Sequence, residues 1–212
     1  MKKKKEKIII IGSGGHAKVI VDILETSSDY QISGLLDPGN LGNTVLGVPV
    51  VGDDILLESL YAEGMKKVFI AIGDNRKRGI LFNKAKKIGY TVVNAISCHS
   101  TVSSSVKLGE GIAIMAGAVI NPDTIIGDNT IINTGTTIDH DCIISKNVHI
   151  APGCSIAGRV KIGSGSFIGI GTKIIPEISV GSSTVIGAGS VVINNIPSRV
   201  TAFGVPARVQ KT

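Results

Sequence analysis

Large aromatic side chains are almost missing from this sequence of 212 residues, which contains no Trp, four Phe and three Tyr. Such rings normally supply the largest buried areas of a protein core. In their place the sequence has 34 Ile and 27 Gly, and 43% of its residues are hydrophobic. We therefore expect a narrow core of small branched side chains, in a chain long enough for one large or two small domains.

Long apolar runs and a strong charge bias are lacking as well. Every apolar run is far shorter than the roughly 20 residues of a membrane helix, and no signal-peptide core follows the basic residues at the start. Of the net charge of +6, residues 2–7, with five Lys and one Glu, carry +4. No row of basic and aromatic residues is left to bind nucleic acid. We expect a soluble, cytoplasmic protein with a solvated basic tail, no membrane insertion and no nucleic-acid partner.

Cysteine is scarce, and its number and spacing do not suggest paired cysteines. The three cysteines, Cys98, Cys142 and Cys154, are an odd number and form no CxxC motif. This pattern favours reduced thiols over a disulfide framework.

The second half of the sequence is built on a six-residue repeat. Fifteen units fill residues 106–195 without a break, and the third position is aliphatic in every unit. The first position is small or β-branched, and Gly recurs at the fourth. Such a unit is typical of a very short strand followed by a corner, for which we expect the glycine to supply the turn. Two weaker units extend the repeat back to about residue 94.

The first half alternates predicted strands with predicted helices. Strands are expected over residues 7–11, 32–36 and 68–72, and helices follow the first and third of them, to about residue 24 and over 76–87. This alternation predicts a small parallel sheet.

A glycine-rich turn, Gly12-Ser-Gly-Gly-His-Ala17, joins the first strand to its helix. Backbone N–H groups and the helix dipole make such a turn a candidate phosphate site. With Asp37 twenty residues beyond Ala17, the turn also fits a dinucleotide fingerprint. Three interpretations of this turn therefore remain open: a nucleotide-sugar site, an NAD site, or a tight turn with no ligand.

The two halves together resemble one family. A GxGGH-type turn on a small Rossmann-like domain, joined to hexapeptide repeats and ending in Gly-Val-Pro-Ala at 204–207, is similar to the hexapeptide-repeat sugar O- and N-acyltransferases. The resemblance implies an α/β nucleotide-sugar-binding domain at residues 1–93 and an all-β left-handed parallel β-helix at residues 94–212. That handedness is an exception to the usual right-handed crossover. The family also implies acetyl-CoA as co-substrate and a homotrimer.

By the same resemblance, the first domain holds a UDP-sugar. The residues that inherit this role are Gly12, Gly14, Gly15, His16, Asp37 and Asn75. The sequence departs from the family at one point, because Pro38 follows Asp37 where relatives often have a second acidic residue.

The catalytic residues are expected in the repeat segment 133–141, which matches the family pattern N-T-x-x-x-I-[ED]-H-[ED]. His140 is the candidate general base, because imidazole titrates near neutral pH. Asp141 stands where the family usually has Glu, so the shorter side chain is expected to reach the histidine less well, and Asp139 is an alternative partner. Gly158 lies 18 residues, or one coil, after His140, and its N–H is the candidate oxyanion donor.

The remaining expected contacts are those with acetyl-CoA, and they also follow from the resemblance: Asn133, His149, Gly158, Gly171 and Pro206. Within the repeat only His140 and His149 are histidines, so no metal site is expected. Cys142 and Cys154 fall at inward positions and are expected to be core residues rather than nucleophiles.

The sequence thus predicts an acetyltransferase acting on the amino group of a UDP-linked 4-amino-6-deoxy sugar, by direct transfer with His140 as base. One alternative is O-acetylation of sialic acid or another sugar. A second alternative, from a different class, is a non-catalytic scaffold that binds nucleotide sugars.

Overall fold

A computed structural model describes residues 5–27 and 29–210 of the chain. Most of the predicted basic tail, residues 2–4, lies outside these residues. The chain divides into two compact units between Cys98 and His99, a few residues beyond the boundary expected at 93. Each unit is described by itself. No helix among the described residues is both long enough and apolar enough to cross a membrane.

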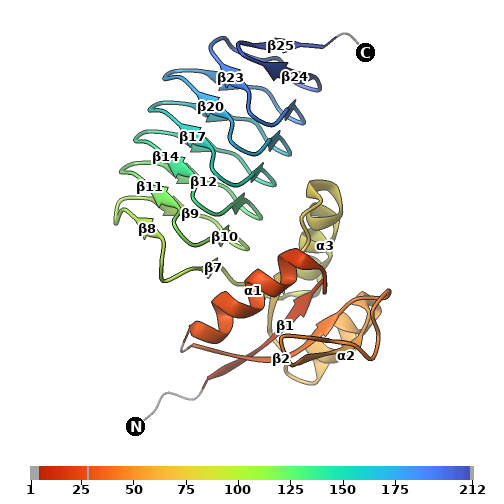
Figure 1. Cartoon of the computed structure of the whole chain (residues 1–212). Helices are drawn as coiled ribbons and strands as arrows, with labels where there is room; N and C mark the ends of the chain where they lie inside the picture. The colour runs from red at the N-terminus through yellow and green to blue at the C-terminus, as the bar shows by residue number, and fades with distance from the viewer. Residues whose placement is uncertain (1–4, 28, 211–212) are drawn as a thin grey trace. The chain divides into compact units, whose positions relative to one another are not determined.

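The first unit is an α/β domain around a six-stranded sheet (Figure 1). The sheet order is β3-β4-β2-β1-β5-β6, and all neighbours are parallel except β3 and β4. The elements are β1 (Glu6–Ile11), α1 (Gly15–Thr26), β2 (Tyr30–Leu36), β3 (Thr44–Val45), β4 (Val48–Gly52), the 3-10 helix η1 (Asp54–Leu56), α2 (Leu57–Ala62), β5 (Lys67–Ile70), α3 (Asn75–Ile88), β6 (Thr91–Val92) and β7 (Ala95–Ile96).

The central strand β1 explains why this sheet is parallel. All four of its isoleucines, at 8–11, are buried, so both faces of the strand are covered, as is usual in parallel sheets. Ile9 and Ile11 pack with Leu57 of α2 and Phe82 of α3 in one core. The three predicted strands and two helices are confirmed, whereas the β3–β4 hairpin, α2 and β6 had no clear sequence signal.

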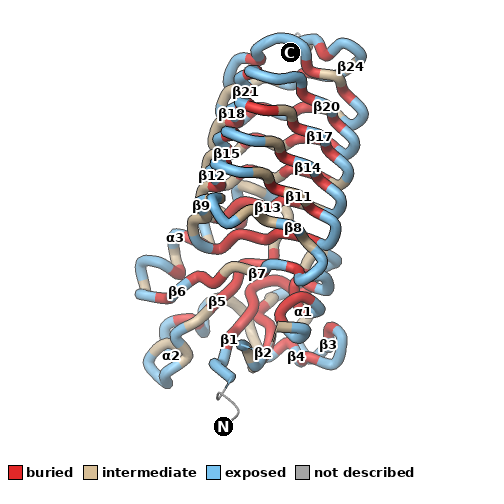
Figure 2. Tube along the Cα trace, turned by 90° about the vertical axis from the view of Figure 1, so that its left-hand side faces the viewer, coloured by how far each residue is buried: buried red, intermediate tan, exposed pale blue. Residues whose placement is uncertain are grey.

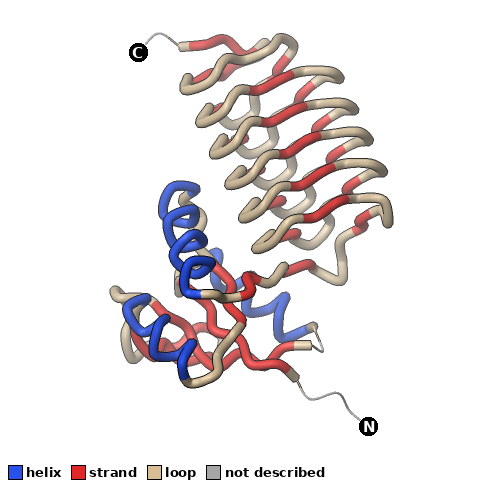
Figure 3. The backbone as a smooth tube through the Cα atoms, turned by 180° about the vertical axis from the view of Figure 1, so that it is seen from behind, coloured by secondary structure: helices blue, strands red, loops and turns tan. Residues whose placement is uncertain are grey.

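The second unit is a parallel β-helix made of two-residue strands that stack in three columns (Figure 3). A C-terminal hairpin, β24 and β25, closes the last coil. The strands are β8 (Thr101–Val102), β9 (Lys107–Leu108), β10 (Ala113–Ile114), β11 (Val119–Ile120), β12 (Ile125–Ile126), β13 (Ile131–Ile132), β14 (Thr137–Ile138), β15 (Ile143–Ile144), β16 (His149–Ile150), β17 (Ser155–Ile156), β18 (Lys161–Ile162), β19 (Phe167–Ile168), β20 (Lys173–Ile174), β21 (Ser179–Val180), β22 (Val185–Ile186), β23 (Val191–Val192), β24 (Thr201–Gly204) and β25 (Ala207–Val209).

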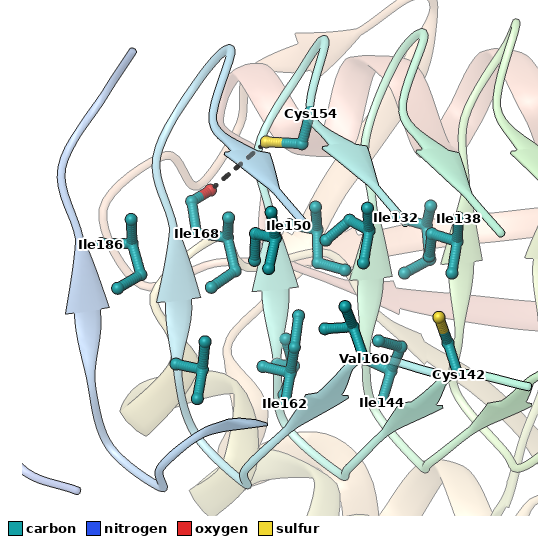
Figure 4. Packing of buried hydrophobic residues seen from close by; sticks show 14 of the residues in the cluster. Ile132, Ile138, Cys142, Ile144, Ile150, Cys154, Val160, Ile162, Ile168 and Ile186 are labelled. Atoms are coloured by element: carbon teal, nitrogen blue, oxygen red, sulfur yellow. Dashed lines mark hydrogen bonds between the residues drawn. The ribbon is translucent and has the colours of Figure 1, made fainter. Parts of the chain in front are cut away.

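From β8 to β23, each strand pairs with the strand one coil later in a register of 18 residues. Ile138 of β14, for example, lies beside Ile156 of β17, which lies beside Ile174 of β20. The third-position side chains therefore form continuous buried columns along the inside (Figures 2 and 4). The last coil is shorter, because Ile186 of β22 lies beside Ala202 of β24, 16 residues later. The predicted six-residue frame is confirmed, and so is the core of small branched side chains.

The corners correct one expectation about glycine. Positive φ angles occur at the sixth position of the repeat. They are adopted mostly by Gly, Asp and Asn, as at Gly135 (66°), Asp141 (59°) and Asn147 (58°), and also by Arg159, Glu177 and Ser183. The fourth-position glycines serve another purpose, because a Cβ at Gly127 would lie 2.6 Å from the backbone N of Lys146 in the next coil. Fourth-position glycine thus permits close stacking of coils. The expectation that it supplies the turn is wrong.

First-position side chains add a second set of bonds between coils. The Oγ1 of Thr124 and of Thr136 donate to the carbonyl oxygens 15 residues later, at 2.8 and 3.1 Å. The thiol of Cys142 lies 3.2 Å from the Ala157 carbonyl, and that of Cys154 lies 3.2 Å from the Gly169 carbonyl. Both thiols are fully buried, and burial raises the pKa of Cys142 to about 11 and raises the pKa of Cys154. As predicted, these cysteines are core residues.

This pattern predicts how the core responds to substitution at Cys154. Thr fills the same position one coil earlier and one coil later, at Thr136 and Thr172, so Cys154→Thr should fit and retain the inward bond. Cys154→Val has the same shape as Thr but no donor, and we expect it to be less stable than Cys154→Thr by about 1 kcal/mol. Urea unfolding of the two variants measures the difference. A Val variant at least as stable as the Thr variant would contradict the role assigned to these bonds.

Candidate functional site

A cavity of about 540 Å³ opens at the ends of the parallel strands in the first unit. Its walls come from the ends of β1, β2 and β5 and from the start of α1 and α3. The carboxyl ends of parallel strands are the usual position of ligand sites in such sheets. Five of the six predicted substrate residues line the cavity, namely Gly12, Gly14, Gly15, His16 and Asp37.

The three glycines of the turn are not equivalent. Gly12 has a φ of 106°, and a Cβ on it would lie 2.7 Å from the Ala71 carbonyl oxygen, so the fold itself requires glycine there. A Cβ on Gly14 or Gly15 would meet nothing within 4 Å. A tight turn therefore accounts for Gly12 alone, while Gly14 and Gly15 leave space on the side of the cavity.

The start of helix α1 is suited to an anion. Gly14 is the N-cap residue and offers no side-chain cap, and the first turn of α1 has no acidic residue. The first N–H groups of a helix have no partner within the helix, and its dipole is positive at this end. A phosphate group at this turn would receive both interactions.

Asp37 holds the glycine-rich turn in place. Its Oδ2 accepts hydrogen bonds from the N and Oγ of Ser13, at 3.0 and 2.7 Å, and its Oδ1 accepts one from Gly39 N at 2.9 Å. Burial opposes ionisation of this carboxyl group, but the hydrogen bonds from Ser13, Gly39 and Asn40 outweigh it and lower the pKa of Asp37. A carboxylate thus lines the cavity beside the glycine-rich turn.

Asn75, the sixth predicted residue, does not line the cavity. Its Oδ1 accepts a hydrogen bond from Nη2 of Arg78 at 2.7 Å. Arg78 is buried, and its Nη1 also donates to the carbonyls of Ile72 and Gly73, two wall residues. Burial lowers the pKa of Arg78 to about 10. Asn75 therefore supports a wall of the cavity through Arg78 and is not itself in the wall.

Sequence reasoning missed a cation of this cavity. Lys77, in the first turn of α3, is a wall residue, and Asp74 caps the same turn by accepting from Lys77 N at 2.7 Å. Lys77 lies one turn into a helix that follows the end of a strand. This position could have identified it from the sequence, because such residues reach the same sheet edge as the glycine-rich turn.

A second group of predicted residues meets at one corner of the β-helix. His140 occupies the fifth position of its repeat unit and Asp141 the sixth, where the left-handed backbone turns. The Nδ1 of His140 lies 2.7 Å from Oδ2 of Asp141, and both side chains are about half exposed. A carboxylate can only accept, so this contact places the proton on Nδ1 and leaves Nε2 as the unprotonated nitrogen.

The alternative partner of His140, Asp139, has a different function. Its Oδ1 accepts from the backbone N of His140 at 2.8 Å and from Nδ2 of Asn121, one coil earlier, at 3.0 Å. The bond from Asn121 is the main reason that the pKa of Asp139 is lowered. The expectation that Asp141 reaches the imidazole less well is wrong, because the left-handed corner turns this short side chain toward the ring.

Gly158 stacks on His140, as predicted. A Cβ on Gly158 would lie 2.7 Å from Nε2 and 2.8 Å from Cε1 of the imidazole, so the ring occupies the space that a side chain would need. The neighbouring backbone groups form hydrogen bonds between coils. Arg159 N donates to the His140 carbonyl, and the Gly158 carbonyl accepts from Glu177 N. The Gly158 N–H donates to no acceptor among the residues that the structure describes.

A groove of about 440 Å³ runs along the face of the β-helix next to this corner. Outward side chains of β14, β17 and β20, namely Thr137, Ser155 and Lys173, form one wall. Asp139 and Ala157, which precede His140 and Gly158 in sequence, line it as well. The lining of the groove thus ends one residue short of His140 and Gly158 along the chain.

Apart from Gly158, the residues expected at acetyl-CoA lie on other parts of the β-helix. His149 Nε2 is 3.3 Å from Asn133 Nδ2, and its ring stands edge-to-face on Phe167 with centroids 5.1 Å apart. Gly171 is at a left-handed corner with open space around it. Pro206 lies in the turn between β24 and β25.

Within residues 5–27 and 29–210, no group of three or more His, Cys, Asp or Glu side chains is arranged to hold a metal ion.

The glycine-rich turn yields a prediction that separates folding from binding. Gly15→Ala adds a methyl group into open space at the start of α1, where Ala favours the helix over Gly by up to about 1 kcal/mol. We expect an unchanged or higher melting temperature, but at least about tenfold weaker binding of UDP or GDP by calorimetry, because the methyl group keeps a phosphate from the N–H groups.

The matched control is Val19→Ala, on the exposed side of the same helix. It should bind the nucleotide as the parent protein does. A Gly15→Ala variant with parental affinity would show that this turn is merely structural.

Two family models match the chain. Residues 7–85 match the PglD N-terminal domain, and residues 105–140 match the bacterial transferase hexapeptide repeat. A comparison with curated proteins gives no match.

Several solved structures resemble the whole chain. A perosamine N-acetyltransferase from Caulobacter crescentus, PerB, in complex with CoA and GDP-perosamine is 44% identical over 97% of each chain, with a TM-score of 0.92. The acetyltransferase domain of PglB from Neisseria gonorrhoeae, in complex with acetyl coenzyme A, is 36% identical over 98% of this chain and all of that chain, with a TM-score of 0.93. WeeI from Acinetobacter baumannii is 27% identical over 97% of this chain, with a TM-score of 0.88.

These likenesses extend over both units and confirm the expected family and fold class. The glycine-rich turn, the hexapeptide coils and the histidine corner all lie within the matched length. The chain belongs to the hexapeptide-repeat sugar acyltransferases and is an acetyl-CoA-dependent acyltransferase, with a Rossmann-like α/β domain followed by a left-handed parallel β-helix.

Proposed function

We propose that this protein transfers the acetyl group of acetyl-CoA to the amino group of a nucleotide-linked 4-amino-6-deoxy sugar. The observation that carries the proposal is the His140 ring, held by Asp141 on one nitrogen and facing Gly158 with the other. The complex of PerB with CoA and GDP-perosamine supports an amino sugar as acceptor.

His140 acts as the general base. Asp141 accepts a hydrogen bond from Nδ1–H of the imidazole. Nε2 can then take a proton from the amine as the amine nitrogen attacks the thioester carbonyl. The Asp141 carboxylate also stabilises the imidazolium that forms. His140 then gives this proton to the departing sulfur, so that one N–C bond forms, one C–S bond breaks and the base is regenerated.

Gly158 stabilises the negative charge that develops on the carbonyl oxygen. Its N–H has no acceptor among the described residues, and the Cα–Cβ direction of Gly158 points at Nε2. This supports Gly158 as the donor to the oxyanion. Both thiols of the β-helix are buried and have raised pKa values, which favours direct transfer over an acyl-cysteine intermediate.

The acceptor binds in the cavity of the first unit. Its diphosphate lies on the Gly14–Gly15 turn near Lys77, and Asp37 faces a ribose or base group. The family resemblance implies UDP as the nucleotide, whereas the relative at 44% identity is in complex with a GDP-sugar. Both nucleotides are therefore included in the test.

Acetyl-CoA supplies the acetyl group as a thioester and reaches the imidazole through the groove of Thr137, Ser155 and Lys173. Asn133, His149, Gly158, Gly171 and Pro206 are the residues proposed to hold it. Gly171, with open space around it, fits a close approach of a ligand. A homotrimer, in which neighbouring β-helices complete the site, is part of the proposal, and light scattering tests it.

The first test measures release of CoA thiol with UDP- and GDP-linked 4-amino-6-deoxy sugars. His140→Ala should lower kcat by about 10²–10⁴-fold, with little change in KM for either substrate, because it removes the proton acceptor. Asp141→Asn should lower kcat by about 10–100-fold.

Each alternative predicts a different result. An amide product resists hydroxylamine, whereas the ester from O-acetylation is cleaved. A nucleotide-sugar scaffold would bind UDP or GDP without releasing thiol. Parental turnover by His140→Ala would contradict the mechanism.

Gly158→Ala tests the space beside the imidazole. The added Cβ would collide with the ring and not with backbone, so the ring should move while the fold persists. A displacement of about 1 Å is expected to cost about 10²-fold in kcat. Circular dichroism and thiol release measure the two effects.

Ala188, which has the same position in its repeat unit, shows that this backbone accepts Ala. Ala188→Gly is therefore the matched control, with parental kcat expected. Full activity in Gly158→Ala would refute the assigned position of the base.

A further inference from the structure

The corner that carries His140 continues into the following coils as a column of charged residues. The sixth-position residues of this corner are spaced by 18 residues: Asp123, Asp141, Arg159 and Glu177. Backbone bonds keep them in register, since Arg159 N donates to the His140 carbonyl at 2.9 Å and Glu177 N to the Gly158 carbonyl at 3.0 Å. Successive members are therefore about 4.8 Å apart.

Arg159 lies between two carboxylates in this column, and the structure pairs it with one of them. Its Nε and Nη2 both donate to Oε1 of Glu177, at 3.0 and 2.7 Å. The other carboxylate, Asp141, instead contacts His140 Nδ1 at 2.7 Å. The long Arg side chain could span either gap, so its direction depends on which carboxylate holds it.

Competition for Asp141 would harm the reaction. Arg–carboxylate pairs are strong and often bidentate, so an unheld Arg159 would compete with the imidazole for the Asp141 oxygens. It would also bring a positive charge next to a ring that must become positively charged when it accepts a proton.

We propose that Glu177 is a positioning residue for acyl transfer, which holds Arg159 away from Asp141 and so reserves Asp141 for His140. This inference rests on the proposed function of His140 as base. Glu177 itself touches neither the imidazole nor, on this proposal, the substrates.

The other charged groups around the imidazole do not take over the role proposed for Glu177. Asp139 is occupied by Asn121 and by the backbone N of His140. Asp123 lies one coil before Asp141, on the far side of it from Arg159, and adds negative charge. Lys173 lines the groove on the adjacent face, as Asp139 does.

The test compares Glu177→Gln with the double variant Arg159→Gln/Glu177→Gln. Glu177→Gln should lower kcat by about tenfold with little change in KM, and should move the acidic limb of the pH profile of kcat/KM to lower pH. The double variant should regain most of the activity and the parental profile, because the competing cation is gone. Melting temperatures should change little, since an exposed ion pair contributes little to stability.

NMR can follow the C2–H resonance of His140 against pH in the same variants. The pH dependence of this resonance should change in Glu177→Gln, whereas loss of a merely structural ion pair would leave it unchanged. A parental profile in Glu177→Gln, or a double variant as impaired as the single one, would overturn the proposal. His140→Ala separates this outcome from failure of the proposed function: if that variant is inactive while Glu177→Gln is parental, only the role of Glu177 is lost.

Discussion

Backbone hydrogen bonds between successive coils are the interaction on which the second unit depends. Every coil is bonded to the next through them, as when Asp139 N donates to the Ile156 carbonyl and Arg159 N to the His140 carbonyl. Because the 18-residue register holds from β8 to β23, each position of the repeat stacks there on its own copy one coil later. A residue with special chemistry therefore meets a predictable neighbour.

The functional corner uses this stacking in three ways. Gly158 leaves room for the imidazole of the coil before it, Asn121 holds Asp139 from the coil before that, and Glu177 holds Arg159 from the coil beyond. The left-handed backbone at Asp141 then turns its carboxylate to the ring. A short side chain suffices there because the corner geometry supplies the reach that a longer one would provide.

Glycine has several distinct functions in this chain, and only contacts tell them apart. Gly12 is required by its backbone angle and by the Ala71 carbonyl, Gly127 by the next coil, and Gly158 by an imidazole. Gly14 and Gly15 are required by none of these. Their small size fits the proposed approach of a phosphate group to the start of α1.

The sequence by itself determined the repeat frame, the inward isoleucines and the strand–helix alternation, because these depend on local periodicity. With the family resemblance, which implied three repeat units in a coil, it also placed Gly158 beside His140. It could not place Asn75 against Arg78 or Lys77 in the cavity wall, and it gave fourth-position glycine a turn role that the structure does not bear out. Nor could it choose between Asp139 and Asp141 or pair Arg159 with Glu177. Those choices depend on side-chain direction and on backbone handedness at single corners, which only the packed tertiary structure decides.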